Sequence, residues 1–260
     1  MSLEMADTPP HRAKPDFSAF RLATDVLFPF KWAGPAEEWR EGGIPVGKGA
    51  YGRVTRWIRR NEDGQIEDEV AVKEADQGDE DTVEGGETGL SLEAVLHSQL
   101  NEVGCESIVH LRSFKLVNTT WRYYLEYAPY GHLDRLRERY KAFNTYLPEV
   151  FLWHLFHSLA RATCAMATTG HWRRLLRGGI QEQYPDGWNM IHFDIKQANI
   201  LVSKEVQLKD ELGATGLTWS FPGIKLADFG LAMITGESDK DNPSDCFWRG
   251  TRYWAPPVSP

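Results

Sequence analysis

The glycine-rich segment of residues 47–52, followed directly by residues 54–58, restricts the fold more than any other feature of this chain. Glycines let a backbone approach phosphates, and successive N–H groups can bind an anion. A dinucleotide fold or a P-loop needs a helix after the glycines, whereas the β-branched and aromatic residues 54–58 favour a strand. Residues 42–48 have P-loop spacing, but Pro45 interrupts them and Gly49 replaces the metal-binding hydroxyl residue. We therefore expect a strand–loop–strand unit.

A second constraint is the segment of residues 191–202, which carries three functional groups within six positions. Asp194 can accept a proton, Lys196 can neutralise a phosphate, and Asn199 offers a carbonyl oxygen suited to Mg²⁺. Such a set fits phosphoryl transfer, because that reaction needs positioning and charge stabilisation more than covalent chemistry. A polar surface loop before a strand explains the same residues, so this segment alone leaves both interpretations open.

Partner motifs in a fixed order decide between these two interpretations. An apolar run, residues 69–73, ends in Lys73; a short strand-like run, residues 224–227, precedes Asp228; and the segment 250–256 follows. The set resembles the eukaryotic protein kinase family over about residues 44–257. A lysine two positions after Asp194 resembles the serine/threonine-specific form of the catalytic loop.

The resemblance implies an α+β, protein-kinase-like bilobal fold. The first lobe would be an antiparallel β-sheet with one key helix, and the second would be mainly helical and incomplete here. We divide the chain into a partly disordered N-terminal extension (1–40), a first lobe with the hinge (41–128) and a partial second lobe (129–260). Residues 171–189 and 204–222 are expected to be inserts. The first, which bears arginines, is expected to be solvated, with an anionic docking surface as the alternative.

Local signals place the elements of the two lobes. Residues 61–64 predict a hairpin turn, residues 76–89 a solvated loop, and Ser91 the start of a helix over 92–100. Strands are expected at 108–111 and 123–127, and Pro148 is expected to open a longer helix. Helical spacing predicts that this helix turns one apolar stripe to the core: Leu152, Leu155, Phe156, Leu159, Ala162 and Met166. His154 and His157 are expected to be structural.

The resemblance implies a catalytic role for each matching residue. Asp194 would be the catalytic base, and Lys196 would stabilise the γ-phosphate of ATP. Lys73 would reach the α- and β-phosphates, and Glu93 would pair with Lys73. An ordinary surface glutamate at position 93, or Glu87 as the partner, are the competing interpretations.

The resemblance also implies binding sites for the cofactors, ATP and Mg²⁺. Asn199 and Asp228 would hold the metal, and Thr251 would contact the catalytic loop. Backbone groups of the hinge would bind adenine. The residues expected to contact the nucleotide are Gly47, Gly49, Gly52, Val54, Ala71, Lys73, Glu126, Ala128 and Leu201.

Several positions depart from the family pattern. His97 stands where the family has an apolar residue packed toward Phe229, which leaves open whether the helix is loosened. Phe193 replaces an arginine that pairs with a phosphorylated activation segment, so activation by that phosphate is doubtful. Pro257 replaces a glutamate, and the chain ends at Pro260, so we expect an incomplete lobe to expose apolar surface. Thr235, Ser238 and Ser244 are candidate phosphorylation sites.

Composition restricts the partners. The formal net charge is −8 without a long basic run, which argues against nucleic acid or an anionic membrane as the main partner. The three cysteines have neither disulfide nor zinc spacing, and the apolar residues near 26–28 are too few to span a membrane. We therefore expect an intracellular protein, cytoplasmic or nuclear. Residues 26–32 are expected to pack on the first lobe, with docking of a regulatory partner as the alternative.

Two functional hypotheses follow. The first is a Mg-ATP-dependent serine/threonine kinase that phosphorylates a protein substrate with Asp194 as the base. The second is a pseudokinase, a nucleotide-binding interaction module without turnover. The presence of Lys73, Glu93, Asp194, Asn199 and Asp228 favours the first, and the missing part of the second lobe favours the second.

Overall fold

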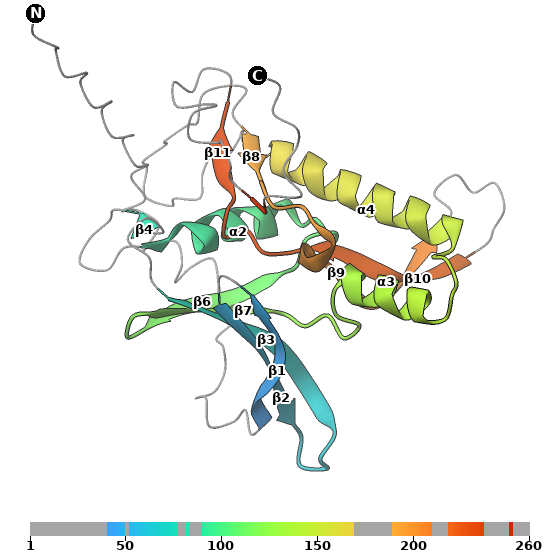
Figure 1. The fold of residues 1–260 in the computed structure, drawn as a ribbon. Coiled ribbons are helices and arrows are strands. Elements are labelled where there is room, and N and C mark those ends of the chain that lie inside the picture. Colours follow the sequence, from blue (N-terminus) through green and yellow to red (C-terminus); the bar gives the residue numbers. More distant parts are fainter. Residues whose placement is uncertain are drawn as a thin grey trace, which may run out of the picture.

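The computed structural model describes residues 41–49, 52–76, 82–83, 90–168, 189–209, 218–236 and 250–251 of the 260-residue chain. These residues form a five-stranded sheet and a second region of helices and β-hairpins (Figure 1). Helix α2 (Leu92–Val103) lies between the two, in contact with a strand of the sheet and with helix α4 (Glu149–Thr168). The bilobal α+β fold expected from the sequence is confirmed.

The sheet is antiparallel and has the order β1-β2-β3-β7-β6. Its strands are β1 (Glu41–Gly49), β2 (Gly52–Arg60), β3 (Ile66–Asp76), β6 (Leu111–Val117) and β7 (Thr120–Glu126). Gly49 pairs with Gly52 across the glycine-rich turn, which confirms the strand–loop–strand unit. The predicted turn at 61–64 joins β2 to β3, where the Asn61 side chain accepts a hydrogen bond from the Gln65 N–H (2.8 Å) and Gly64 has φ +78°.

The prediction of a strand at 108–111 is wrong in its position. Strand β6 begins only at Leu111, and Ile108 forms an isolated parallel bridge with Leu226 instead. The Val109 N–H donates to the Leu226 carbonyl (2.9 Å), and the His110 carbonyl accepts from the Glu126 N–H of β7 (2.9 Å), so the backbone before β6 bonds to both regions. Residues 107–110 are therefore a connection between the two regions.

Helix α2 begins where the sequence predicts, but it ends at Val103 rather than at the expected Leu100. The Ser91 side chain caps its N-terminus by accepting from the Ala94 N–H (3.4 Å), and Gly104 ends it with φ +68°. Seven consecutive residues of the helix, Ala94 to Leu100, are buried. Before it, β4 (Thr82–Val83) pairs with β5 (Leu90–Ser91) within the expected loop, most of which lies outside the described residues.

The second region places two helices over two long strands. Helices α3 (Leu133–Ala142) and α4 pack on the hairpin of β9 (Ile200–Lys209) and β10 (Thr218–Leu226) around Leu133, Phe151 and Ile200. A smaller two-stranded sheet pairs β8 (Asn189–Ile191) with β11 (Met233–Thr235), and a 3₁₀ helix, η3 (Gln197–Asn199), precedes β9. The catalytic-loop segment 192–199 thus runs between two strands.

The described residues of the expected insert at 204–222 belong to strands. Strands β9 and β10 continue through it, with pairing from Ile200–Leu226 out to Lys209–Thr218. Alternating apolar residues, such as Val206 and Leu208, suit a paired strand. Apart from Asn189, the other expected insert (171–189) lies outside the described residues, as does the N-terminal extension 1–40.

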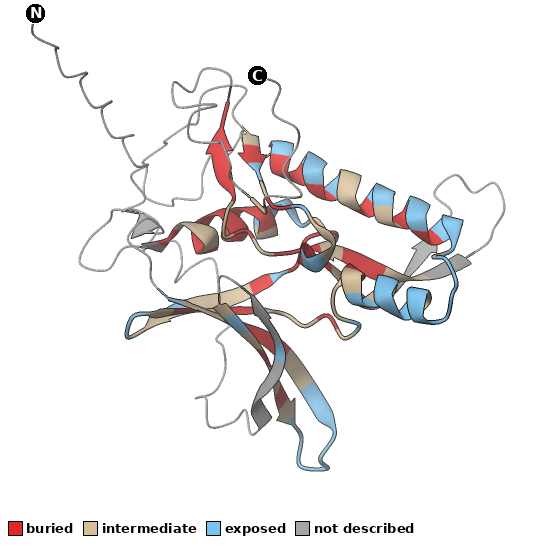
Figure 2. Cartoon of the chain, in the orientation of Figure 1, coloured by how far each residue is buried: buried red, intermediate tan, exposed pale blue. Residues whose placement is uncertain are grey.

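Helix α4 turns most of the predicted stripe to the core, but not all of it; Figure 2 shows one side of the helix buried and the other exposed. Ala162 and Met166 are buried and Leu155 and Leu159 pack against a buried cluster, whereas Leu152 and Phe156 are 45% and 66% exposed. Phe151 and His154 are buried as well. His154 is structural, as expected, because its Nε2 bonds to the Pro222 carbonyl (3.0 Å) and its ring stacks on Phe221. The exposed side also carries Val150 and Trp153, so apolar exposure in this region is confirmed. Within the described residues, none of the helices is long and apolar enough to cross a membrane.

Candidate active site

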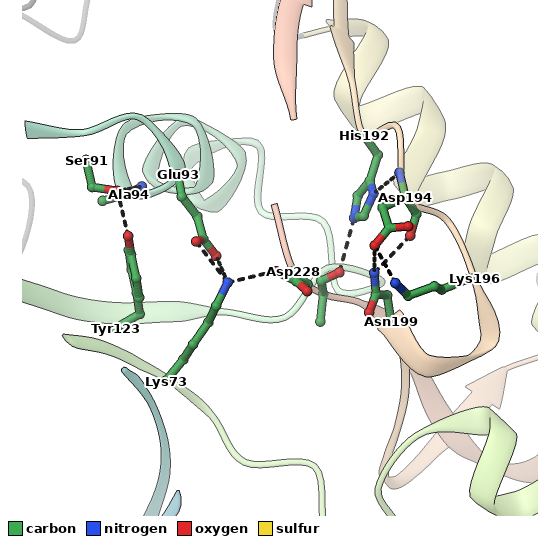
Figure 3. A network of polar contacts seen from close by, with 11 residues as sticks. Lys73, Ser91, Glu93, Ala94, Tyr123, His192, Asp194, Lys196, Asn199 and Asp228 are labelled. Carbon is green, nitrogen blue, oxygen red and sulfur yellow. Dashed lines mark hydrogen bonds and ion pairs between the residues drawn. The ribbon is translucent and has the colours of Figure 1, made fainter. Parts of the chain in front are cut away.

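A lysine and two carboxylates from distant parts of the chain form a buried cluster. Lys73 Nζ lies 2.7 and 2.9 Å from the two carboxylate oxygens of Glu93 and 2.7 Å from Asp228 Oδ1 (Figure 3). The side chains of Lys73 and Glu93 are only 9% and 11% exposed. We call Lys73, Glu93 and Asp228 the lysine cluster. The pair expected between Lys73 and Glu93 is present, and Glu87 lies outside the described residues.

Three elements bring the lysine cluster together. Lys73 lies on β3 between its register partners Val54 and Tyr123, and Glu93 is in the first turn of α2. The Ser91 hydroxyl, which caps α2, lies 2.6 Å from the Tyr123 hydroxyl on β7, so a hydrogen bond fixes the start of the helix to the sheet.

Asp228 follows β10 and has φ +68°, a left-handed conformation that is uncommon outside glycine. This conformation turns the chain sharply at the end of the strand. The carboxylate meets Lys73 there, 31% exposed.

The electrostatics of the lysine cluster favour the charged forms. Burial alone would lower the pKa of the Lys73 ammonium, but attraction to Glu93 and Asp228 raises it well above its ordinary value. Burial would likewise raise the pKa of Asp228, but the neighbouring ammonium holds it below its usual range. Both groups are therefore ionised at neutral pH.

A second set of polar groups surrounds Asp194, and we call Asp194, Lys196, Asn199 and Thr251 the loop cluster. Asp194 Oδ2 accepts from Lys196 Nζ (2.7 Å) and Asn199 Nδ2 (2.9 Å). Its Oδ1 accepts from the Thr251 N–H (3.0 Å) and hydroxyl (2.7 Å). Burial would raise the pKa of Asp194, but the bonds from Lys196 and Thr251 hold it below its usual value. The carboxylate is thus oriented and ionised.

Gly250 allows Thr251 to approach the catalytic loop. Gly250 has φ +92°, and a Cβ there would lie 2.2 Å from the carbonyl oxygen of Phe193. Phe193 itself has φ +63°. A side chain at position 250 would therefore push Thr251 away from the loop that carries Phe193 and Asp194. The glycine is thus needed for steric reasons.

The two clusters are connected through the backbone on either side of them. The Ala227 N–H donates to the Asn199 carbonyl (2.9 Å). The residue before Asp228 is therefore bonded to Asn199, the candidate metal ligand in the loop cluster. His192 Nδ1 accepts from the Asp194 N–H (3.2 Å), which leaves Nε2 protonated to donate to the Ala227 carbonyl (3.1 Å). Burial lowers the pKa of His192, consistent with this neutral form.

The sequence assigned no role to His192. Its position two residues before Asp194 is the only signal that could have found the link, because the Ala227 carbonyl it binds is 35 positions away.

The expected nucleotide-binding residues lie on the sheet, the hinge and β9. Ala71 and Ala128 are buried, whereas Val54, Glu126 and Leu201 are partly exposed. Leu201 is brought to the hinge by a bridge to His132. Within the described residues the Ala128 N–H makes no hydrogen bond, so it is a donor left for a ligand. Side-chain surroundings of Gly47 and Gly49 lie outside the description.

Gly52 has a role that the sequence did not predict. It has φ +139°, and a Cβ there would lie 2.0 Å from the Glu74 carbonyl oxygen. Only glycine therefore lets β2 begin this close to the residue after Lys73.

The oxygen groups present fit a magnesium ion that is shared with a phosphate. Asn199 donates from Nδ2 to both the carbonyl and the carboxylate of Asp194, which leaves its carbonyl Oδ1 as an acceptor. Asp228 uses Oδ1 for Lys73, and no contact within the described part of the chain involves its Oδ2. Mg²⁺ commonly takes one or two protein oxygens and completes its shell with phosphate and water. The described residues contain no group of three His, Cys, Asp or Glu ligands, so they fit this shared mode rather than a closed cage.

The structure bears on the departure at position 97 and on the candidate phosphorylation site at position 235. His97 is 2% exposed, its Nε2 lies 2.5 Å from the Val109 carbonyl, and its ring lies 4.9 Å from that of Phe229. It therefore keeps the packing toward Phe229 and adds a hydrogen bond. Thr235 is 1% exposed, which argues against its phosphorylation in this conformation. Ser238, Ser244 and Pro257 lie outside the described residues.

A cavity of about 470 Å³ elsewhere does not compete with this site. It is lined by Glu69, Glu126, Arg112, Lys225 and their neighbours, and contains neither Lys73, Asp194 nor Asp228. Its charged groups largely pair with one another, as Arg112 does with Asp68 (2.8 Å) and Lys225 with Glu126 (2.9 Å). The chemistry of the two clusters therefore remains the best candidate.

Comparison with known proteins agrees with this geometry. Residues 41–258 match the protein kinase domain family. A probable serine/threonine-protein kinase of Dictyostelium discoideum is 25% identical over 219 residues, which are 84% of this chain and 34% of that protein. MAP3K epsilon protein kinase 1 of Arabidopsis thaliana is 29% identical over 217 residues, 83% of this chain and 12% of that protein, so the chain spans only a part of either relative. With most of its length matched and both clusters assembled, the chain belongs to the protein kinase domain family.

Proposed function

We propose that this chain is the catalytic part of a protein serine/threonine kinase that transfers the γ-phosphate of Mg-ATP to a hydroxyl group. One observation carries the proposal: Lys73, Glu93 and Asp228 meet within 2.9 Å, beside an oriented and ionised Asp194. These groups supply positive charge for phosphates, a metal ligand and a proton acceptor, which are the parts that phosphoryl transfer needs.

Each residue would act at a stated atom. Asp194 would accept the proton of the substrate hydroxyl on a carboxylate oxygen as the oxygen–phosphorus bond forms and the bond to ADP breaks. Lys196, 2.7 Å from Asp194, would neutralise the transferred phosphate, and Lys73 would hold the α- and β-phosphates. Asn199 and Asp228 would bind Mg²⁺, which when bound neutralises charge on the β- and γ-phosphates.

The choice of serine or threonine rests on two observations. Lys196 follows Asp194 by two positions and contacts both Asp194 and Thr251 (2.6 Å), so it lies where the hydroxyl of a substrate would meet the base. The Dictyostelium relative is named a probable serine/threonine-protein kinase. We therefore expect transfer to serine or threonine in preference to tyrosine.

The proposal is tested by thermal melting and by a phosphorylation assay. We expect Mg-ATP to raise the melting temperature, ATP with EDTA to raise it less, and phosphate to appear on a serine- or threonine-containing protein but not on a tyrosine-only one. A chain that melts identically with and without Mg-ATP does not bind the nucleotide and is not a kinase. Binding without transfer would instead support an interaction module that keeps the fold.

A further inference from the structure

Helix α2 packs on both regions: it lies against β6 of the sheet, and it places Leu96 and Leu100 in a cluster with the second region. Leu96 and Leu100 belong to one buried apolar cluster with residues of the second region and of the 107–110 connection: Ile108, Ala162, Ala165, Met166, Met190, Leu226, Phe229, Ala232 and Ile234. Among the described residues, none of the members of this cluster lies on the five-stranded sheet. Ala94 alone represents the helix in the cluster on the sheet side, with Leu111, Trp121 and Tyr123.

Two polar side chains on one face of α2 add hydrogen bonds to this packing. His97 Nε2 lies 2.5 Å from the Val109 carbonyl. One turn later, Asn101 donates from Nδ2 to the Leu111 carbonyl (2.6 Å) and accepts the Leu111 N–H on Oδ1 (3.1 Å). The two side chains therefore bind the backbone on both sides of His110, where β6 begins.

The same backbone segment is bonded to the strand that leads to Asp228. The Val109 N–H donates to the Leu226 carbonyl (2.9 Å), and the Leu226 N–H donates to the Ser107 carbonyl (2.8 Å). The carbonyl of Val109 thus bonds to the His97 side chain, and the N–H of Val109 bonds to Leu226. Leu226 lies two residues before Asp228, and His97 lies four residues after Glu93.

We propose that His97 and Asn101 act as a positioning pair that fixes Glu93 relative to Asp228 through the segment 107–111. The two carboxylates of the lysine cluster are then held as one unit, and β3 brings Lys73 to a site already formed. Among the described residues, neither side chain makes a hydrogen bond or an ion pair with the lysine cluster. Only the expected effect on nucleotide affinity rests on the proposed function.

Purely apolar packing is the competing explanation for His97, because its ring also touches Phe229. The two explanations predict different effects for two substitutions. His97→Leu keeps an apolar side chain and removes the donor, whereas His97→Gln keeps an N–H donor. Asn101→Ala removes the second half of the pair. Ser98→Ala is the matched control, because the buried Ser98 hydroxyl bonds only within the helix, to the Ala94 carbonyl (2.6 Å).

Hydrogen–deuterium exchange without nucleotide tests the positioning directly. We expect the amides of α2 and of 107–111 to exchange about tenfold faster in His97→Leu and Asn101→Ala, because each leaves buried backbone groups unpaired. His97→Gln and Ser98→Ala should match wild type. Wild-type exchange in both His97→Leu and Asn101→Ala would overturn the proposal.

Nucleotide affinity gives a readout that a merely structural role would not move. We expect His97→Leu to raise the Kd for Mg-ATP about tenfold in wild type but to have no further effect in a Glu93→Gln background, since the pair acts through Glu93. Equal effects in both backgrounds would overturn the proposal. If the wild-type chain binds Mg-ATP but transfers no phosphate, the proposed function fails, and exchange together with affinity still decides the role of His97 and Asn101.

Discussion

The lysine cluster and the loop cluster lie side by side but are built in opposite ways. The lysine cluster joins residues that are 20 and 155 positions apart, so it exists only while β3, α2 and β10 are packed together. Three members of the loop cluster lie within six residues, and Thr251 alone comes from 57 positions away. The arrangement of the loop cluster therefore depends mainly on local backbone geometry, whereas that of the lysine cluster depends on how the two regions pack together.

The largest effect is expected from removing the base of the loop cluster. Asp194→Asn should lower kcat by about 10²–10⁴-fold, because an amide cannot accept the proton. Mg-ATP should still raise the melting temperature as it does in wild type, since the lysine cluster is intact. Phosphorylation kinetics measure the loss of kcat, and thermal melting measures the retained binding. Activity equal to wild type would show that Asp194 is not the base.

Lys73→Met should instead damage the lysine cluster and the fold together. The substitution would remove the ammonium that both carboxylates bind, and breaking a buried pair typically destabilises by about 3–5 kcal/mol. Without that ammonium, burial would raise the pKa of Asp228, so this loss should shrink as pH falls and Asp228 binds a proton. Urea unfolding at pH 5.5 and 8 measures it.

Lys204→Met is the matched control for that substitution. Lys204 is 74% exposed and lies 3.5 Å from Glu69, so its removal should change the free energy of unfolding by less than about 1 kcal/mol. Equal losses in the two variants would show that the lysine cluster is no more important to stability than a surface pair.

Gly250→Ala should weaken the contact between Thr251 and Asp194 in the loop cluster. Its Cβ would meet the Phe193 carbonyl at 2.2 Å, so Thr251 must move away from Asp194, and we expect kcat to fall by about 10–100-fold. Gly64→Ala is the control, because Gly64 also has positive φ but no atom lies within 4 Å of its Cβ position. A similar loss of activity in both variants would point to backbone strain rather than to the clash.

The smallest effect concerns pH and the helix that carries Glu93. Burial lowers the pKa of His97 to about 4, with Lys73, His110 and His192 as the charged or titratable neighbours. Because the unfolded chain binds a proton near pH 6.5 and the folded chain does not, His97 stabilises the fold less and less as pH falls below 6.5. Between pH 7 and 5 this loss should be about 1–2 kcal/mol.

His97→Leu should make the stability less sensitive to pH in that range. The other titrating groups are shared by both proteins, so the difference between the two unfolding curves isolates His97. Parallel curves for wild type and variant would show that His97 does not titrate in this way.

The sequence predicted most of the two clusters because their chemistry depends on residue type and order. Lys73 and Glu93 could be paired from a strand and a capped helix, and Asp194 and Asn199 from one short loop. These elements are long or strongly capped, so local preference and final structure agree. The contact of Thr251 with Asp194, which the resemblance implied, is also present.

Other features could not be read from the sequence, because backbone partners leave little trace in residue type. The bonds of His97 and Asn101 go to carbonyl and N–H groups, which nearly every residue has. Ile108 and Val109 favour a strand, yet their backbone binds Leu226. On α4, apolar residues occur on both sides, so spacing could not tell the buried Phe151 from the exposed Phe156.

The shared ammonium of Lys73 has a consequence for how a metal ion could enter. One positive charge already balances half of the negative charge of Glu93 and Asp228, so a bare divalent cation gains little attraction and is repelled by the amine. Under the proposed function, the phosphates of a bound nucleotide would give Lys73 a new anionic partner and would leave Asp228 to hold the metal. We therefore expect the metal and the nucleotide to bind together more readily than either would bind alone.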